Sequence, residues 1–219
     1  MPAAEPPMHE LPKPRLRGRL HQAAFFASIP AGPVLLWVAP SPAARWGALV
    51  YWLTLLAQFG ASASYHRGSW GERAFGRMRA LDHSAIFLLI AGTYTPMSLT
   101  ILEGTSRVVV LAVVWAGAVA GIGTKLYRVD LHVLSGILYV GLGWVAVAVL
   151  PAMARGLPRP AFVLVLAGGI LYTLGALVLA RKRPDPFPAT FGYHEVWHAA
   201  TVIAAACLYT AILLTFLAG

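Results

Sequence analysis

Hydrophobic residues are concentrated in long runs that short polar segments separate. The 219-residue chain contains seven such runs, at about residues 22–39, 43–65, 81–102, 107–124, 131–152, 160–180 and 193–217. Each of these runs is long enough to cross about 30 Å of hydrocarbon as a helix. The pattern therefore predicts an all-α, polytopic membrane protein built as one bundle of seven transmembrane helices.

The segment before the first run has a different composition. Residues 1–19 are rich in proline and positive charge, as expected of a disordered tail that ends at a membrane surface. A signal peptide is the alternative, but Pro30 and Pro33 interrupt the following run, and no clear cleavage site precedes the next helix. We therefore predict a tail at residues 1–19 and a transmembrane domain at residues 20–219.

The overall composition agrees with a membrane location. Hydrophobic residues make up 58% of the chain and charged residues 11%, which excludes an ordinary soluble domain. The net charge of +9 does not indicate nucleic-acid binding, because the basic residues form short clusters between apolar runs. A single cysteine, Cys207, excludes an intrachain disulfide and gives no sign of an oxidising compartment.

The basic residues predict the orientation of the bundle, because positively charged loops stay in the cytoplasm. If the runs alternate in direction, one side carries thirteen Lys and Arg residues and the other carries four. The first set is Lys13, Arg15, Arg17, Arg19, Arg67, Arg73, Arg77, Arg79, Lys125, Arg128, Arg181, Lys182 and Arg183, and the second is Arg45, Arg107, Arg155 and Arg159. The N-terminus is therefore predicted inside and the C-terminus outside.

Candidate chemistry begins at the start of the last run. His194 and His198 are four residues apart, so on a helix their imidazoles share one face and can bind one metal ion. Zinc suits such ligands, and a third protein ligand with one open position would make the site catalytic. The predicted orientation places His66 and Asp82 at the same cytoplasmic depth, at the end of the second run and the start of the third.

Each upstream candidate also has a simpler interpretation. His66 beside arginines can be an interfacial histidine, but its match in depth with the histidine pair favours a ligand. Asp82 can be a helix N-cap or a group that assists a metal-bound water, and the two roles can coexist. Ser62 lies four residues before His66, so its hydroxyl shares a helix face with that imidazole.

The letters from His194 to His198 also match the H-E-x-x-H helix of metalloproteases, in which the glutamate is the general base. No Asp or Glu follows Glu195 and no histidine follows His198, so the third ligand must come from upstream, which weakens the protease interpretation. Glu195 leans off the ligand face, and its part in the site stays open.

The remaining histidines receive no role in the site. His83 points about 100° away from Asp82 on a helix and is interpreted as a packing or interfacial residue. His9, His21 and His132 lie in or beside the tail or in a cytoplasmic loop, and are interpreted as solvated residues.

Four stretches together resemble the bacterial haemolysin III proteins, which belong with the progestin and adipoQ receptor family and are more distantly similar to alkaline ceramidases. They are Ser62-x3-His66, Leu81-Asp82-His83-Ser84-Ala85-Ile86-Phe87, Ala91-Gly92-Thr93-Tyr94-Thr95-Pro96 and Phe191-Gly192-Tyr193-His194-Glu195-Val196-Trp197-His198. The resemblance covers about residues 18–217. It implies a seven-helix bundle in the bacterial inner membrane with zinc near the cytoplasmic face, held by His66, His194 and His198, and with Ser62 and Asp82 beside it.

The leading functional hypothesis is a zinc-dependent hydrolase of lipid amide or ester bonds, with a membrane lipid as its substrate. Asp82 would orient or deprotonate a water, and Ser62 would hydrogen-bond to that water or to the developing oxyanion. Two alternatives stay open: a sensor or regulator of membrane homeostasis with a structural zinc, and a pore-forming cytolysin. The family's eukaryotic receptors carry an extended cytoplasmic domain that this chain lacks, so their signalling is not carried over.

Overall fold

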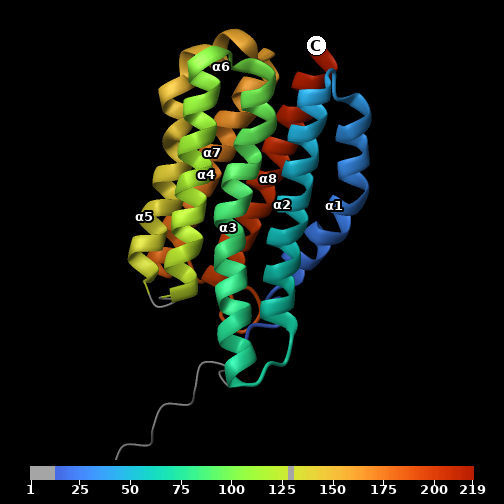
Figure 1. The fold of residues 1–219 in the computed structure, drawn as a ribbon. Helices are drawn as coiled ribbons and strands as arrows, with labels where there is room; N and C mark the ends of the chain where they lie inside the picture. The colour runs from blue at the N-terminus through green and yellow to red at the C-terminus, as the bar shows by residue number, and fades with distance from the viewer. Residues whose placement is uncertain (1–12, 128–130) are drawn as a thin grey trace, which may run out of the picture.

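The computed structural model describes residues 13–127 and 131–219, and these fold almost entirely as helices. Seven helical rods correspond to the seven predicted runs (Figure 1). The elements are α1 (Arg19–Val38), α2 (Pro42–Arg67), α3 (Glu72–Ile101), α4 (Gly104–Tyr127), α5 (His132–Gly143), the 3₁₀ helix η1 (Trp144–Val149), α6 (Leu150–Gly156), α7 (Arg159–Arg181) and α8 (Tyr193–Ala218).

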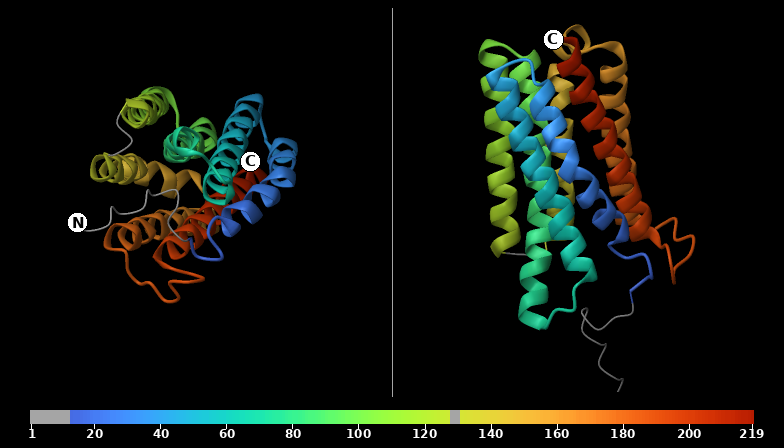
Figure 2. Two further views of the ribbon diagram at one scale, coloured as in Figure 1. Left: turned by 90° about the horizontal axis from the view of Figure 1, so that it is seen from below. Right: turned by 90° about the vertical axis from the view of Figure 1, so that its right-hand side faces the viewer.

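The rods form a closed bundle in which neighbours along the chain also lie side by side. Contacts join α1 to α2, α2 to α3, α3 to α4 and α7 to α8, and α8 packs back against α1. Figure 2 shows this closure from below, with α8 beside α1. One end of the bundle therefore gathers the starts of α1, α3 and α8 and the end of α2.

Five of these rods are long and apolar enough to cross a membrane: α3, α4, residues Val133–Gly156, α7 and α8. They identify a helical protein with several membrane spans. The rods α1 and α2 are not among the five, because Pro30, Pro33 and interior polar residues such as Gln58 reduce their hydropathy. Seven crossings and the orientation of the termini therefore stay predictions.

Two boundaries differ from the predicted pattern. The third helix begins at Glu72, with Gly71 at its N-cap, so the polar link after α2 is only residues 68–71. Asp82 consequently lies within α3, and its interpretation as a helix N-cap is wrong. The fifth run is interrupted at Trp144, where Gly141, Gly143 and the β-branched valines that follow lower the helix propensity and a 3₁₀ segment forms.

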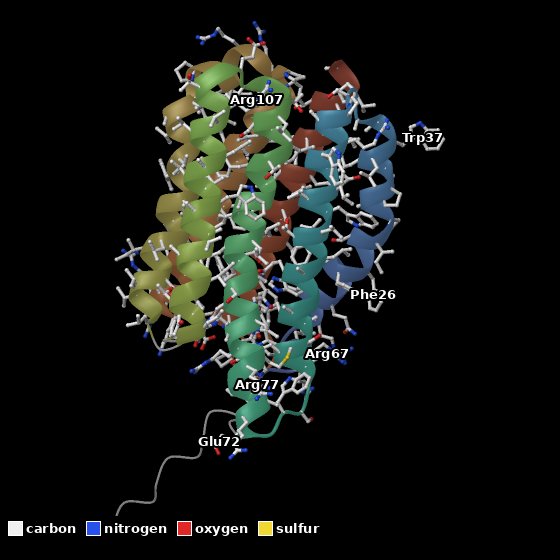
Figure 3. All side chains as sticks on the ribbon, viewed as in Figure 1. Phe26, Trp37, Arg67, Glu72, Arg77 and Arg107 are labelled. Carbon is white, nitrogen blue, oxygen red and sulfur yellow. The ribbon has the colours of Figure 1, made fainter. Side chains whose placement is uncertain are left out.

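The outer surface is strongly apolar. Large hydrophobic side chains are exposed on every rod; in Figure 3, Phe26 and Trp37 project outward from α1 with 58% and 87% of their surface exposed. Labelled charged residues lie near the ends instead, with Arg67, Glu72 and Arg77 at one end and Arg107 at the other. An exposed apolar surface of this kind fits contact with hydrocarbon, because exposing it to water would be costly in free energy.

The core has two apolar parts that leave room for polar groups at one end. One part joins α1, α2 and α8 through Leu35, Tyr51 and Ile212, and the other joins α3, α4 and α5 through Phe87 and Val114. Buried polar side chains then follow one face of α2 at four-residue spacing: Thr54, Gln58, Ser62 and His66. This polar face ends at the histidine cluster.

Candidate metal centre

Three histidines meet where α2 ends and α8 begins. His66 belongs to the last turn of α2, and His194 and His198 to the first two turns of α8, so the spacing of four residues places the latter pair on one face. His66 and His198 are buried, with 7% and 2% of their surface exposed, and His194 is half-buried. A buried cluster of imidazoles in an apolar bundle indicates a functional role.

The three rings are close enough to share an ion. Nε2 of His194 lies 3.2 Å from Nε2 of His66, and the ring centroids are between 4.6 and 4.9 Å apart. One ligand nitrogen from each ring lies within 4.8 Å of the other two. The triad can therefore bind a metal ion, while the roles of the individual residues as ligands stay predictions.

Asp82 lies beside the triad, on α3. Its Oδ2 is 3.7 Å from Nε2 of His66, too far for a direct hydrogen bond but within the span that one water bridges. Within the described parts of the chain, the group of mutually close ligand atoms contains the three histidines and not Asp82. Ser62, only 1% exposed and one turn before His66, places its hydroxyl against the Asp82 carboxyl group.

Glu195 is occupied elsewhere. Its Oε1 accepts a hydrogen bond from Nε of Arg17, and its Oε2 accepts one from the backbone N–H of Gly192 at 2.9 Å. The side chain is 1% exposed, so this ion pair is almost completely enclosed on the carboxylate side. Glu195 thus stabilises the start of α8 and pairs with the N-terminal segment, an arrangement that does not favour a general base.

The interpretation of His21 as a solvated residue is wrong. His21 is 2% exposed, and its ring stacks on the ring of His198 with a centroid separation of 3.8 Å and an interplanar angle of 6°. Its Nε2 lies 3.0 Å from Oγ1 of Thr201. The sequence did contain a sign of this role, because His21 lies at the start of the first run, at the same predicted depth as the other histidines. His9 lies outside the described residues, as does the side chain of His132.

The segment before α1 lies across this end of the bundle. The backbone N–H groups of Arg15 and Leu16 donate to the carbonyls of Ala189 and Thr190 in the α7–α8 loop, each at 3.1 Å. The predicted tail at residues 1–19 is therefore bound to the bundle over at least this part. Residues 1–12 lie outside the described residues.

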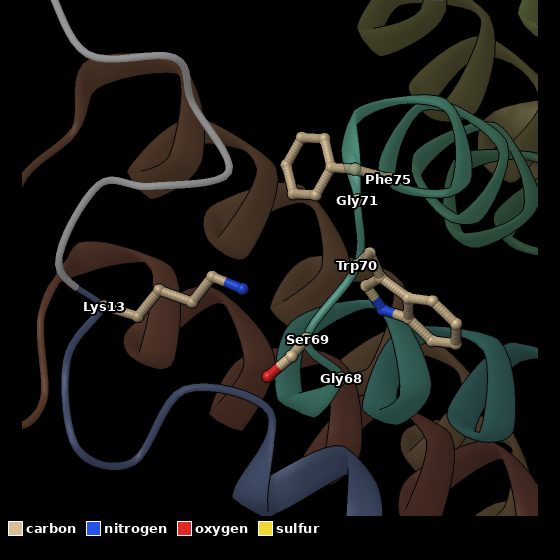
Figure 4. Close-up of a pocket in the computed structure, with 6 residues that line it drawn as sticks. All are labelled: Lys13, Gly68, Ser69, Trp70, Gly71 and Phe75. Atoms are coloured by element: carbon tan, nitrogen blue, oxygen red, sulfur yellow. The ribbon is translucent and has the colours of Figure 1, made fainter.

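The same segment also approaches the α2–α3 link. Figure 4 shows Lys13 directed toward Gly68, Ser69 and Trp70 across a pocket of about 370 Å³. Its Nζ lies 6.0 Å from the ring centroid of Phe75. Burial, and then the nearby charge of Arg17, lower the pKa of Lys13 from its ordinary value. The segment thus contacts the α7–α8 loop and the α2–α3 link, on both sides of the histidines.

Gly18 in this segment packs directly against His66 of the triad. Its φ of +75° is unfavourable for other residues, and a Cβ there would lie 2.8 Å from Cβ of His66 and 3.0 Å from Cγ of Arg67. We expect Gly18→Ala to displace His66, to cost about 1–2 kcal/mol for the backbone conformation alone, and to weaken metal retention. Metal content per chain and thermal unfolding of the purified protein measure both effects.

Gly123→Ala is the matched control, because a Cβ at that position in α4 meets nothing within 4 Å. If Gly18→Ala retained metal as Gly123→Ala does, Gly18 would not be packed against the ligand as described.

Comparison with known proteins agrees with the motifs. Residues 9–209 match the family model described as Haemolysin-III related, which covers most of the chain and every candidate residue of the centre. This protein belongs to the haemolysin-III related family. That membership confirms the resemblance to haemolysin III and to the progestin and adipoQ receptor family.

Two bacterial relatives illustrate the similarity. The chain is 29% identical over 197 residues to the "Hemolysin-3 homolog" of Bacillus subtilis (strain 168), and the alignment covers 88% of this chain and 89% of that protein. It is 37% identical over 134 residues to "Hemolysin-3" of Bacillus cereus, covering 61% of this chain and 58% of that protein. The first alignment thus extends over most of both chains.

Proposed function

We propose that this haemolysin-III protein is a zinc-dependent membrane hydrolase that cleaves an amide or ester bond of a lipid. The observation that carries the proposal is a triad of converging imidazoles with a carboxyl group 3.7 Å away that is not part of the ligand group. Three nitrogen ligands and one free position are typical of catalytic zinc, whereas structural sites are closed by a fourth protein ligand.

The donor set fits zinc in chemistry, and one pair of its nitrogens also fits in spacing. Two nitrogens that bind one tetrahedral zinc at about 2.0–2.1 Å are about 3.3 Å apart. The Nε2 atoms of His66 and His194 are separated by 3.2 Å. Zinc bound there would supply Lewis acidity and an activated water at its open position.

Asp82 and Ser62 provide the remaining chemistry. The Asp82 carboxylate can accept a proton from a water located between it and the triad, because its 3.7 Å separation from His66 leaves a bridging distance. The Ser62 hydroxyl lies against that carboxyl group and orients it. The apolar outer surface of the bundle favours a substrate that arrives from the bilayer.

The proposal includes the finer topology. Rods α1 and α2 contain 20 and 26 residues, which is long enough to span about 30 Å of hydrocarbon. Together with the five apolar rods they would make seven crossings. Thirteen basic residues against four support a cytoplasmic N-terminus, an inner-membrane location, and a metal centre near the cytoplasmic face.

The test of the reaction is Asp82→Asn in the purified full-length protein. The amide has nearly the same shape but cannot act as a base, so zinc content should stay near one per chain while hydrolysis falls by about 100- to 10,000-fold. Zinc is measured per chain, and hydrolysis is measured on a panel of lipid amides and esters in bilayer discs. Ser84→Ala, a buried polar change two residues along α3, is the matched control.

Three outcomes would overturn parts of the proposal. Unchanged hydrolysis in Asp82→Asn would remove Asp82 as the base. Loss of zinc in Asp82→Asn would place Asp82 inside a closed ligand set and favour a structural zinc in a sensor. Absence of metal from the wild type would remove the hydrolase proposal altogether.

A further inference from the structure

His21 is a fourth histidine at the metal centre, and it lies outside the group of ligand atoms. It comes from the first turn of α1, whereas the triad comes from α2 and α8. It is 2% exposed, and burying a polar ring in an apolar bundle is costly unless the ring is hydrogen-bonded. Ionisable side chains in such bundles usually serve a function. The two contacts of His21 with α8 indicate its function.

The first contact is between rings. The imidazoles of His21 and His198 are nearly parallel, at 6°, with centroids 3.8 Å apart. His21 also contacts the ring of Phe59, with centroids 5.2 Å apart and the rings tilted by 60°. His21 therefore packs against aromatic rings of both α2 and α8, and its stacking limits rotation of the His198 ring.

The second contact is a hydrogen-bond relay through Thr201. The Thr201 hydroxyl donates its one proton to the backbone carbonyl of His198, at 2.8 Å. At Thr201 Oγ1 only lone pairs remain, so Nε2 of His21, 3.0 Å away, must be the donor. The relay thus runs from His21 to Thr201 and ends on the backbone of His198.

We infer that His21 is a positioning residue that fixes the ring plane and the backbone of His198 for metal binding. Within the described chain, Nδ1 of His21 has no hydrogen-bond partner, so Thr201 is the partner on which its polar function depends. Metal-binding sites depend on outer residues of this kind, and their loss typically lowers metal affinity by about 10- to 100-fold. This inference rests on the metal centre of the proposed function.

The experiment measures metal affinity of the purified full-length protein by competition with a chromophoric chelator. His21→Ala removes both contacts, and we expect a 10- to 100-fold lower affinity. His21→Phe keeps a flat ring against His198 but lacks the N–H donor, and Thr201→Val lacks the relay oxygen. Each of these should lower affinity by a smaller factor than His21→Ala.

Non-additivity gives the sharper test. Because His21→Phe and Thr201→Val interrupt the same relay, the double variant should bind metal no more weakly than the weaker-binding single variant. In the cobalt-loaded protein, the visible absorption bands of the His21 variants should shift, since they report ligand geometry. Leu35→Ala, a buried apolar change on the same helix, should reduce thermal stability without changing affinity or spectrum.

The outcomes separate the two proposals. A wild type that binds no metal refutes the proposed function itself. A wild type that binds metal while His21→Phe and Thr201→Val both retain its affinity and cobalt spectrum refutes the role of His21 and leaves the triad intact. Additive losses in the double variant would also refute the relay, and the two mild variants keep the test valid if His21→Ala fails to fold.

Discussion

His66→Ala is expected to remove the metal from the purified protein, reducing it from about one ion per chain to almost none. Only two imidazoles, both from the first turns of α8, would remain of the triad. The metal affinity should therefore fall by more than about 100-fold, which is the largest effect typical of losing a residue that only supports a ligand. His194→Ala and His198→Ala should behave in the same way, because each removes one of three mutually close nitrogens.

Metal analysis of the purified variants checks this result, with His83→Ala as the matched control. His83 also lies at this end of α3, next to Asp82, but it is not a member of the triad. Metal retained in full by His66→Ala would show that α2 contributes no ligand, and metal lost from His83→Ala would show that the ligand set is wrong.

The second large effect is expected at the Arg17–Glu195 ion pair. Glu195 is 1% exposed, and Arg17→Met would leave its charge buried with only the Gly192 N–H as a described donor. Breaking a buried pair in this way costs about 3–5 kcal/mol. Arg17→Met should therefore lower the thermal stability strongly, as measured by loss of helical circular dichroism on heating.

The matched control is Arg19→Met, because Arg19 is a neighbouring basic residue with an exposed side chain. The double variant Arg17→Met with Glu195→Gln should be more stable than Arg17→Met alone, since no charge then remains buried. A double variant as unstable as the single one would mean that Arg17 acts through packing and not through charge.

The sequence predicted the parts of the fold that depend on local pattern. Apolar runs gave the seven rods, and the spacing of His194 and His198 placed them on one face, as in the structure. The hydrophobic pattern could not show that α3 starts at Glu72, because its first turns are polar. Thirty residues rise about 45 Å, more than the about 30 Å of hydrocarbon, so one end can be helical without being apolar.

The contacts around the triad could not be predicted in the same way. His21 stacks on a residue that lies far along the chain, and Arg17 reaches Glu195 across 178 positions. Local periodicity does not show which helix packs on which, so the sequence predicted only a disordered basic tail at residues 1–19 and a solvated His21. The packing of α1 on α2 and α8 brings these side chains to the centre.

The origin of the ligands also constrains how the centre is made during synthesis. His66 and His194 are 128 positions apart, and α8 follows all the other described rods. The chain must therefore be synthesised as far as the first turns of α8 before the three histidines can meet. An ion bound there would close a loop of more than a hundred residues and would link the early and late parts of the chain.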